Sequence, residues 1–565
     1  MCTAGATAFA GSVSYNFDSD PSGILSLFGN ATWAPNDGNP ATGGYLSLTE
    51  AVNSQRSAIV FDDFDNGLVV KAFSFSMDVR IGGGSSTPAD GFSVNYLRAN
   101  DPVLTSGDPL NNWATGPSGD ADLPEEGATT GLAIGFDAYD NGGDGSGGVT
   151  DDVIGISVRV DNVLIAQYPL GSQNTTCEDL TSLQTGPLDA DNPGSPDLLC
   201  WQPFSVDLAE TGKLVVKYKG KEITPAGGLQ TTFIPSPGRL VLVARTGGLN
   251  QNQHIDNLAI TTVASSVPTV SPINAHPAGF DFTILDAGAD KVDSTTVAVT
   301  LNGTAVAAAV SKTADTTSVS FSEFPTLNPA GSTNTVVVSY KDNFGNPLSV
   351  TREYVQVDYA VVPPALALPA GAVSTATPGF VIKSAETDAG NGNSLALTQD
   401  ELAGLLGPNL ADLSLADANG LFHEPAVINY DKDPGTDGQQ GNFGNENLIP
   451  GFPGTGPNMY DNAALEATTY LRFPAAGVYT MGVSSDDGFR VTIAKNAGEK
   501  LGGVLLGQYN NTGGRGAGVP GTLFTFVVQQ AGVYPARLIW ENGGGGSSLE
   551  WFSVKTNGSY VLVND

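Results

Sequence analysis

Short segments in which apolar and polar residues alternate recur along almost the whole chain, and they constrain the fold more than any other feature. Residues 72–80 read AFSFSMDVR, and residues 335–340 read TVVVSY. A repeat of two residues places alternate side chains on opposite faces, as in a half-buried β-strand. The stretches between these segments are turn-like, since the chain contains 71 glycines and 35 prolines. The sequence therefore predicts an all-β protein with many turns.

The spacing of these segments divides the 565 residues into three β-sandwich domains in tandem. We expect a large jelly roll at 12–263 and a third sandwich at 380–565. Between them, about seven short strands in residues 274–358 predict an immunoglobulin-like sandwich. A proline- and alanine-rich stretch, 359–379, is expected to be an extended linker before the third domain.

One helix is expected, near the start of the third domain. Thr398 and Glu401 have the spacing of a capping box, in which each side chain bonds to the other residue's backbone N–H. Gly407 and Pro408 are typical of a helix end. We therefore predict that the helix begins at Thr398 and ends at Leu406.

The balance of charge excludes some classes of partner. The chain carries 58 acidic and 24 basic residues, a formal net charge of -34. Binding to nucleic-acid phosphates needs clustered Lys and Arg, so we expect no nucleic-acid partner. No stretch of 18 apolar residues occurs, so we expect no membrane insertion. Most of the acidic charge is expected to solvate the surface; the sharper alternative is that clustered aspartates bind divalent cations.

Three cysteines bear on the cellular compartment. Cys177 and Cys200 lie in one loop-like stretch, and we predict a disulfide between them; two buried thiols are the alternative. A disulfide implies an oxidising compartment, which favours secretion or the cell surface. Cys2 has no partner, and the small apolar residues around it resemble the tail of a signal peptide without its basic part.

Oxygen-bearing side chains gather in one loop after a predicted strand of the first domain. Asp137, Asn141 and Asp144 alternate with small residues, and Tyr139 can offer its backbone carbonyl. Calcium takes six to eight oxygen ligands in a flexible loop. The sequence here favours a calcium site and a turn stabilised by its own Asp and Asn side chains equally.

The first domain resembles the legume-type (L-type, concanavalin-like) lectins over most of residues 12–263. The resemblance rests on Ala-Asp-Gly-Phe at 89–92, Phe-Asp-Ala-Tyr-Asp-Asn at 136–141, Val-Ile-Gly-Ile at 153–156 and the segment 244–258. It implies that calcium is held by Asp137, the carbonyl of Tyr139, Asn141 and one of Asp144, Asp151 and Asp152. It further implies that Asp90, Gly91 and Asn141 contact the hydroxyl groups of a sugar.

One departure from the lectin pattern concerns a second metal. The family's transition-metal site needs a Glu and a His at positions that are Gly135 and Val153 here. The resemblance therefore implies calcium as the only metal cofactor, with no manganese.

The last domain resembles the protective-antigen-type β-sandwich found in toxins, glycosidases and flocculins, over about residues 410–555. The resemblance rests on Ser-Ser-Asp-Asp-Gly at 484–488 and on the segment Ala-Gly-Val-Tyr to Asn-Gly-Gly-Gly-Gly at 531–546. It implies that Asp486 and Asp487 bind calcium and, through it, a sugar, with Asn510, Asn511 or Asn542 completing the shell. The alternative is that the Asp pair only shapes a turn.

Nothing in the sequence indicates catalysis. The three histidines are widely spread, and no nucleophile or metalloprotease motif occurs. Glycosidases with a lectin-like fold need paired carboxylates, and their usual Glu-x-Asp-x-x-Glu strand signature is absent. Glu125 and Glu126 are expected in a solvated loop. We therefore predict that the chain is not an enzyme.

The leading interpretation is a secreted or cell-surface, calcium-dependent adhesin that binds a glycan or polysaccharide. A second interpretation is a structural subunit of an extracellular fibre, surface layer or matrix, capable of self-assembly as a filament, in which calcium stabilises loops. A third is a non-catalytic part of a larger polysaccharide-degrading enzyme. Fold analogy alone does not decide among them.

Overall fold

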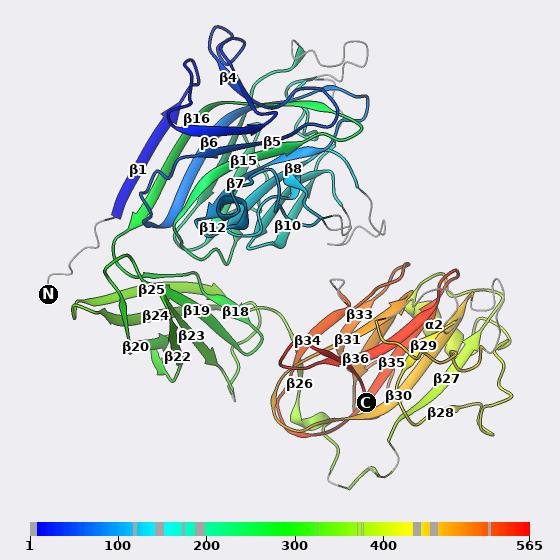
Figure 1. The fold of residues 1–565 in the computed structure, drawn as a ribbon. Coiled ribbons are helices and arrows are strands. Elements are labelled where there is room, and N and C mark those ends of the chain that lie inside the picture. The colour runs from blue at the N-terminus through cyan, green and yellow to red at the C-terminus, as the bar shows by residue number, and fades with distance from the viewer. Residues whose placement is uncertain are drawn as a thin grey trace.

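The computed structural model describes residues 8–116, 121–141, 152–171, 176–186, 198–324, 326–369, 371–374, 376, 378–432, 442–452, 461–517 and 521–565. Among these residues the strands form six sheets, which pack in three successive pairs around separate apolar cores (Figure 1). The predicted all-β, β-sandwich class is confirmed. In this part of the chain, no helix is long and apolar enough to cross a membrane.

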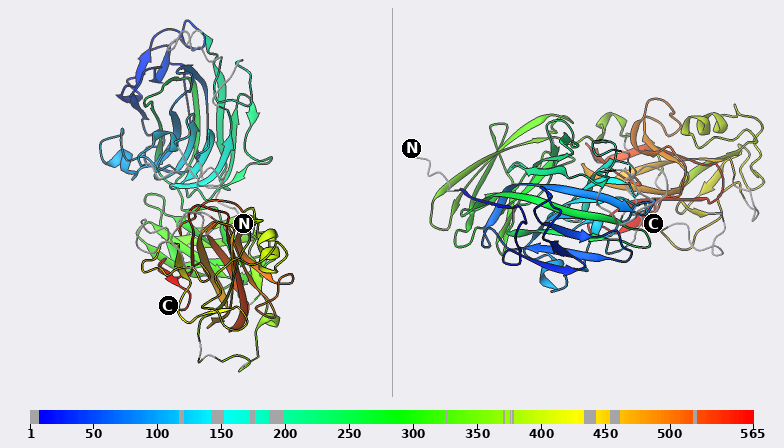
Figure 2. Two further views of the ribbon diagram at one scale, coloured as in Figure 1. Left: turned by 90° about the vertical axis from the view of Figure 1, so that its right-hand side faces the viewer. Right: turned by 90° about the horizontal axis from the view of Figure 1, so that it is seen from above.

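The first pair of sheets stands apart from the other two when the molecule is turned about its vertical axis (Figure 2). Its first sheet has the order β13-β12-β11-β6-β16-β4-β3, with β1 beside β16 and β14 beside β12. These strands are β1 (Ala8–Tyr15), β3 (Thr32–Ala34), β4 (Tyr45–Thr49), β6 (Val69–Gly84), β11 (Gln202–Leu208), β12 (Lys213–Tyr218), β13 (Lys221–Glu222), β14 (Leu229–Gln230) and β16 (Gln251–Ser265).

The second sheet of this pair has the order β10-β9-β8-β7-β15-β5-β2. Its strands are β2 (Leu25–Gly29), β5 (Arg56–Phe61), β7 (Gly91–Arg98), β8 (Leu132–Asp137), β9 (Gly155–Val160), β10 (Val163–Pro169) and β15 (Gly238–Arg245). One face packs on the first sheet: Phe92 and Phe136 stack with ring centroids 4.4 Å apart, and Phe136 meets Phe204 of β11 edge-on.

The outer face of the second sheet is also covered. Residues 99–116 and 121–130, with α1 (Pro102–Thr105) and the 3-10 turn η1 (Pro124–Glu126), supply part of a second apolar cluster against β5, β7 and β15. Every residue of β8 and β9 is also buried, although their apolar core residues still alternate with others. This covered outer face carries Asp137 and Arg159, because they alternate with the core residues Phe136 and Val158.

The middle pair consists of a sheet ordered β17-β19-β23-β22, with β18 beside β19, and a sheet ordered β21-β20-β24-β25. The strands are β17 (Thr269–Val270), β18 (Asn274–His276), β19 (Gly279–Leu285), β20 (Val292–Leu301), β21 (Thr304–Val306), β22 (Ala309–Thr313), β23 (Thr316–Ser322), β24 (Thr333–Asp342) and β25 (Pro347–Val355). Strand β24 buries Val336, Val338 and Tyr340 in strict alternation, as the sequence predicts. The immunoglobulin-like assignment of 274–358 stays a prediction.

The last pair consists of sheets ordered β26-β34-β31-β36-β29, with β37 beside β36, and β28-β27-β30-β35-β32-β33. The strands are β26 (Ala360–Val362), β27 (Phe380–Glu386), β28 (Phe422–Glu424), β29 (Asn429–Asp431), β30 (Ala463–Phe473), β31 (Gly477–Asp486), β32 (Phe489–Ile493), β33 (Val504–Tyr509), β34 (Leu523–Val528), β35 (Gly532–Asn542), β36 (Ser548–Val554) and β37 (Tyr560–Leu562). Strand β26 pairs in parallel with β34, and the turn η3 (Pro364–Leu366) follows it. Part of the expected linker 359–379 thus belongs to a sheet. The three-domain division itself stays a proposal.

The predicted helix exists, but its predicted ends are wrong. Helix α2 spans Leu395–Leu402, with Ser394 as its N-cap residue. Thr398 donates its hydroxyl to the Ser394 carbonyl 2.9 Å away, so it sits inside the helix. Glu401 is buried and accepts hydrogen bonds from Thr387 and Asn391. The helix begins earlier because Leu395 and Leu402 pack together against the sheet.

Candidate metal and glycan sites

The first candidate site lies where β7, β8 and β9 end. Gly91, the first residue of β7, pairs with Asp137, the last residue of β8, so the antiparallel register brings Asp90 beside Asp137. The Asp90 backbone N–H donates to the Arg245 carbonyl, and the Asp90 carbonyl accepts from Ala138. A side chain at Gly91 would overlap the Phe136 carbonyl oxygen, which explains the glycine.

The loop after β8 is held by two aspartates. Asp137 accepts a hydrogen bond from the Tyr139 backbone N–H at 3.0 Å, and Asp152 accepts from the Asn141 N–H at 2.6 Å. Both aspartates are buried. Of the other predicted ligands, Asp144 lies outside the described residues, as does Asp151. The structure thus brings Asp90, Asp137, Asn141 and Asp152 to one end of the sheet.

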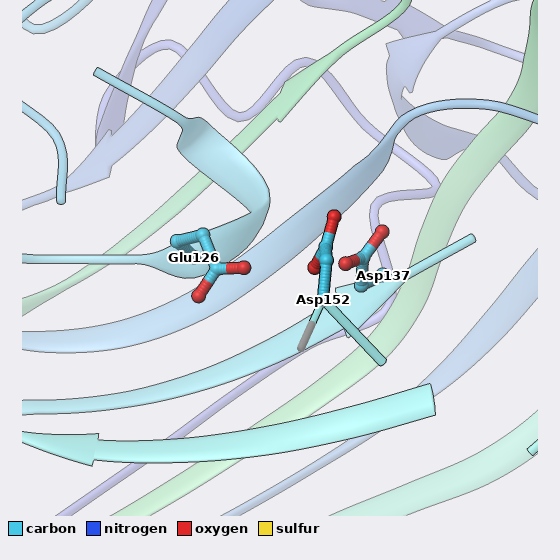
Figure 3. A group of neighbouring side chains, drawn as sticks. All are labelled: Glu126, Asp137 and Asp152. Atoms are coloured by element: carbon cyan, nitrogen blue, oxygen red, sulfur yellow. The ribbon is translucent and has the colours of Figure 1, made fainter. Parts of the chain in front are cut away.

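Glu126 completes a cluster of carboxylates with Asp137 and Asp152 (Figure 3). One oxygen from each of the three lies within 4.8 Å of the others. In Figure 3, Asp137 and Asp152 lie side by side, and Glu126 faces them from the turn of η1. Calcium binds oxygens at about 2.3–2.6 Å, so oxygens on opposite sides of one ion are up to about 5 Å apart. The cluster therefore has the size of a calcium site.

The expectation that Glu125 and Glu126 are solvated is wrong. Both are buried in η1, which packs on β7, β8 and β15. Glu125 accepts two hydrogen bonds from Arg245 Nε, at 2.9 and 2.8 Å, and one from Nη2 at 2.5 Å. Glu126 accepts from Arg159 Nε and Nη2, at 3.0 and 2.6 Å. A buried carboxylate needs such a partner because removing a lone charge from water is costly.

Arg159 is the sequence signal for this arrangement. It interrupts the otherwise uncharged strand GISVRV of β9, in a chain with only 24 basic residues. An arginine inside a buried strand requires a carboxylate opposite it. That requirement predicts a buried carboxylate opposite Arg159, but the sequence alone does not say which of the 58 acidic residues supplies it.

The electrostatics of the cluster favour a bound cation. Burial raises the pKa of Asp137 well above its usual range, and the hydrogen bond and charge of Asp152 raise it further. Burial raises the pKa of Asp90 to about 6; Arg245 opposes this rise and Glu125 adds to it. Asp90 Oδ2 and Asp152 Oδ1 are buried and have no hydrogen-bond partner among the described residues. Unpartnered buried oxygens of this kind fit a calcium ion.

The second candidate site joins β31 to β32. Asp487 is buried and well supplied with donors: Oδ1 accepts from Gly513 N at 2.5 Å, and Oδ2 accepts from Asn393 Nδ2 at 2.8 Å and Gly543 N at 2.9 Å. A side chain at Gly543 would overlap Asn393 Oδ1, so the glycine allows this close approach. The Asp487 carboxylate is therefore held in place by the protein itself.

Asp486 is more open than its neighbour. Its backbone carbonyl accepts from Trp540 Nε1 at 3.0 Å, and its carboxylate shares a hydrogen bond with the carboxylate of Asp487. Burial raises its pKa to about 6, and the charge of Asp487 adds to the rise. Among the predicted shell residues, Asn510 instead accepts from the Leu395 N–H at the start of α2. The peptide bonds before Asp90 and between Asp486 and Asp487 are both cis.

Comparison with known proteins identifies the last region. Residues 430–561 match the PA14 domain family, which confirms the predicted protective-antigen-type domain. No curated protein matches the sequence.

Several solved lectin structures are similar to the N-terminal part of the chain. The calcium- and Man3GlcNAc-bound exoplasmic/lumenal domain of VIP36 is 17% identical, covers 44% of this chain and 88% of its own, and has a TM-score of 0.28. The acidic lectin of winged bean, in complex with methyl-α-D-galactose, is 17% identical over 45% of this chain and 98% of its own, with a TM-score of 0.25. The metal-free lectin I-B4 of Griffonia simplicifolia is 15% identical over 44% and 98%, with a TM-score of 0.27.

Proposed function

We propose that this chain is an extracellular, calcium-dependent carbohydrate-binding adhesin without catalytic activity. The observation that carries the proposal is the buried group of Asp90, Asp137 and Asp152, whose carboxylates include oxygens without any partner among the described residues. The PA14 match over residues 430–561 supports a second calcium and carbohydrate site there. At that site Asp487 accepts three hydrogen bonds from the chain, and the carboxylate of Asp486 accepts fewer from the described residues. The disulfide between Cys177 and Cys200 is consistent with an oxidising compartment.

The chemistry of binding follows from which atoms would be fixed. Calcium would be held by Asp137, Asp152, Asn141 and the Tyr139 carbonyl, and at the second site by Asp486 and Asp487. When bound, the ion supplies positive charge that neutralises these carboxylates and orders their loops. Asp90, Gly91 and Asn141 then present acceptors and donors in fixed directions, as a shallow sugar site requires for hydrogen bonds to a diol. At the second site, Asp486 and Asp487 would contact the sugar in the same way.

Two measurements on chelator-stripped protein test the proposal. Calorimetric titration with calcium is expected to show two sites, with one lost in Asp137→Asn and the other in Asp486→Asn. Binding to a broad glycan array is expected with calcium and not with chelator. Two occupied calcium sites without any glycan retention would overturn the carbohydrate function.

The structural-subunit alternative is favoured by one feature of the fold. Glu210, after β11, forms ion pairs with Lys71 of β6 and with Arg352 of β25 in the middle pair of sheets, both at 3.0 Å. Arg352 also donates to the Val270 carbonyl at 2.9 Å. An ion pair that joins the first and middle pairs of sheets would limit their relative motion, as a rigid spacer requires. Calcium-induced assembly seen by light scattering, with no glycan binding, would favour this function instead.

A further inference from the structure

The most informative feature beyond these sites is the way in which η1 packs on strands β7 and β8. Strands β7 and β8 present glycine at positions 91 and 135, where the turn crosses them. A side chain at Gly135 would overlap the Glu125 carbonyl oxygen, and one at Gly91 would come within 2.9 Å of Glu125 Cβ. The sheet therefore lacks side chains where the backbone of η1 lies, and η1 approaches more closely than a normal strand surface would allow.

Polar side chains of β7 fasten η1 at both ends. Ser93 donates its hydroxyl to the Pro124 carbonyl at 2.6 Å. Asn95 accepts from the Ala128 N–H at 3.1 Å. Gly127, between them, has a φ of 92°, which favours glycine. The turn is thus held rigidly, and its two glutamates point to fixed places.

The two glutamates of η1 differ in what remains open to a ligand. Glu125 uses both carboxylate oxygens for Arg245. Glu126 uses only Oε2 for Arg159, and Oε1 receives no hydrogen bond from the described residues. Glu126 also belongs to the cluster with Asp137 and Asp152, whereas Glu125 does not. Arg159 therefore orients Glu126 while leaving one of its oxygens available.

We propose that Glu126 is a direct ligand of the cation held by Asp137 and Asp152, and that Arg159 is its positioning residue. This rests on the proposed calcium function of that site. Within the cluster, Asp152 is 6% exposed and its Oδ1 lacks a partner among the described residues, which is the independent sign that the cluster takes a ligand. Gly135 and Glu126 therefore depend on each other. Because β8 has no side chain at Gly135, the turn η1 can pack there, and its residue Glu126 places a carboxylate beside Asp137 and Asp152.

Calcium titration of Glu126→Gln, with Glu125→Gln as the matched control, tests the proposal in an Asp486→Asn background that isolates the first site. A ligand role predicts that Glu126→Gln raises the calcium Kd at least about tenfold, while Glu125→Gln changes it less than about threefold. Because Glu126→Gln also leaves the buried Arg159 without its carboxylate, the calcium-free Tm should fall in either case, and the Kd decides between the two roles. A purely structural ion pair with Arg159 predicts an unchanged calcium Kd.

The outcome for Asp137→Asn in the same background separates the two levels of the argument. If Asp137→Asn leaves calcium binding intact, the proposed site itself is wrong. If Asp137→Asn abolishes binding while Glu126→Gln does not weaken it, only the role of Glu126 is overturned. Should Glu126→Gln fail to fold, a calcium-bound crystal structure of the wild type decides: a Glu126 oxygen about 2.3–2.6 Å from the ion supports the proposal, and one beyond coordination distance overturns it.

Discussion

The two candidate calcium sites place aspartates in similar positions at strand ends but supply them with partners very differently. At the first, Asp90 and Asp152 have buried oxygens without partners among the described residues, and Asp137 is pressed against Asp152. At the second, Asp487 accepts three hydrogen bonds from the chain itself. The first arrangement leaves carboxylate oxygens that a cation could compensate, whereas the second is largely satisfied by the chain itself. The sequence motif alone does not show whether the aspartates of a site lack protein partners or are held by hydrogen bonds from the chain.

The largest effect is expected from neutralising the centre of the first site. Asp137→Asn replaces a charged proposed ligand with a neutral one, so calcium affinity at this site should fall by more than about 100-fold. In the calcium-free protein, three acidic neighbours oppose the charge of Asp137, and the substitution removes that repulsion. The calcium-free protein should keep or raise its Tm. Calorimetry and thermal unfolding in chelator measure both. A large loss of Tm in chelator would show that Asp137 is stabilised by the protein and not by an ion.

Removing calcium should loosen the first site more than the second. Amide hydrogen exchange in chelator should increase at residues 138–141 and 152–154, whose order depends on Asp137 and Asp152. It should change less at 513 and 543, whose N–H groups are already bonded to Asp487. Equal increases at both sites would contradict the comparison.

Asn393→Ala tests the organisation of the second site. Asn393 lies before the PA14 match, yet it donates to Asp487 and occupies the space left by Gly543. Loss of this donor should weaken calcium binding at the second site by about 10-fold and leave the first site unchanged. Calorimetry in an Asp137→Asn background isolates the effect. The matched control is Asn409→Ala. Asn409 lies on the other side of α2 in the sequence and donates to the Ser384 carbonyl, not to Asp487.

The smallest effect concerns pH in the calcium-free protein. Burial raises the pKa of Asp90 and Asp486 to about 6, of Glu401 to about 7 and of Glu541 to about 8. The folded state therefore binds more protons than the unfolded chain, whose carboxyl pKa values are about 4. Stability in chelator should rise as pH falls from about 8 toward 4, because these groups contribute stability below their unfolded pKa that is lost as pH rises through the folded pKa.

Calcium binding should show the opposite trend, since protons and calcium compete for the same oxygens. Urea unfolding in chelator at pH 5 and pH 8, beside calcium titration at both values, measures the two trends. Glu541→Gln should reduce the pH dependence of stability and barely alter the pH dependence of calcium binding at the N-terminal site. Parallel trends would contradict the assignment of these carboxylates to cation binding.

Local pattern was sufficient for much of the architecture. Alternation with a period of two predicts strands such as β24, and the Ser-Ser-Asp-Asp-Gly segment coincides with the end of β31 at Asp486 and the turn at Asp487 before β32. Such features depend on residues close in sequence, whose side chains share a face or a turn by geometry alone. The start of α2 did not follow local capping, because the contact of Leu395 with the sheet outweighs the preference of Thr398 for a cap.

The sequence by itself determined the all-β class, the two Asp-bearing segments and the cysteines that a disulfide joins. Only the tertiary structure decided which carboxylates meet. Glu126 precedes Asp137 along the chain, and Asn393 precedes Asp487 by a much longer stretch. Each reaches its aspartate where a glycine leaves room: Gly135 of β8 lies under the backbone of η1, and Gly543, which follows β35, lies against Asn393. That complementarity depends on how separate elements pack, and a residue's own neighbours in sequence carry no trace of it.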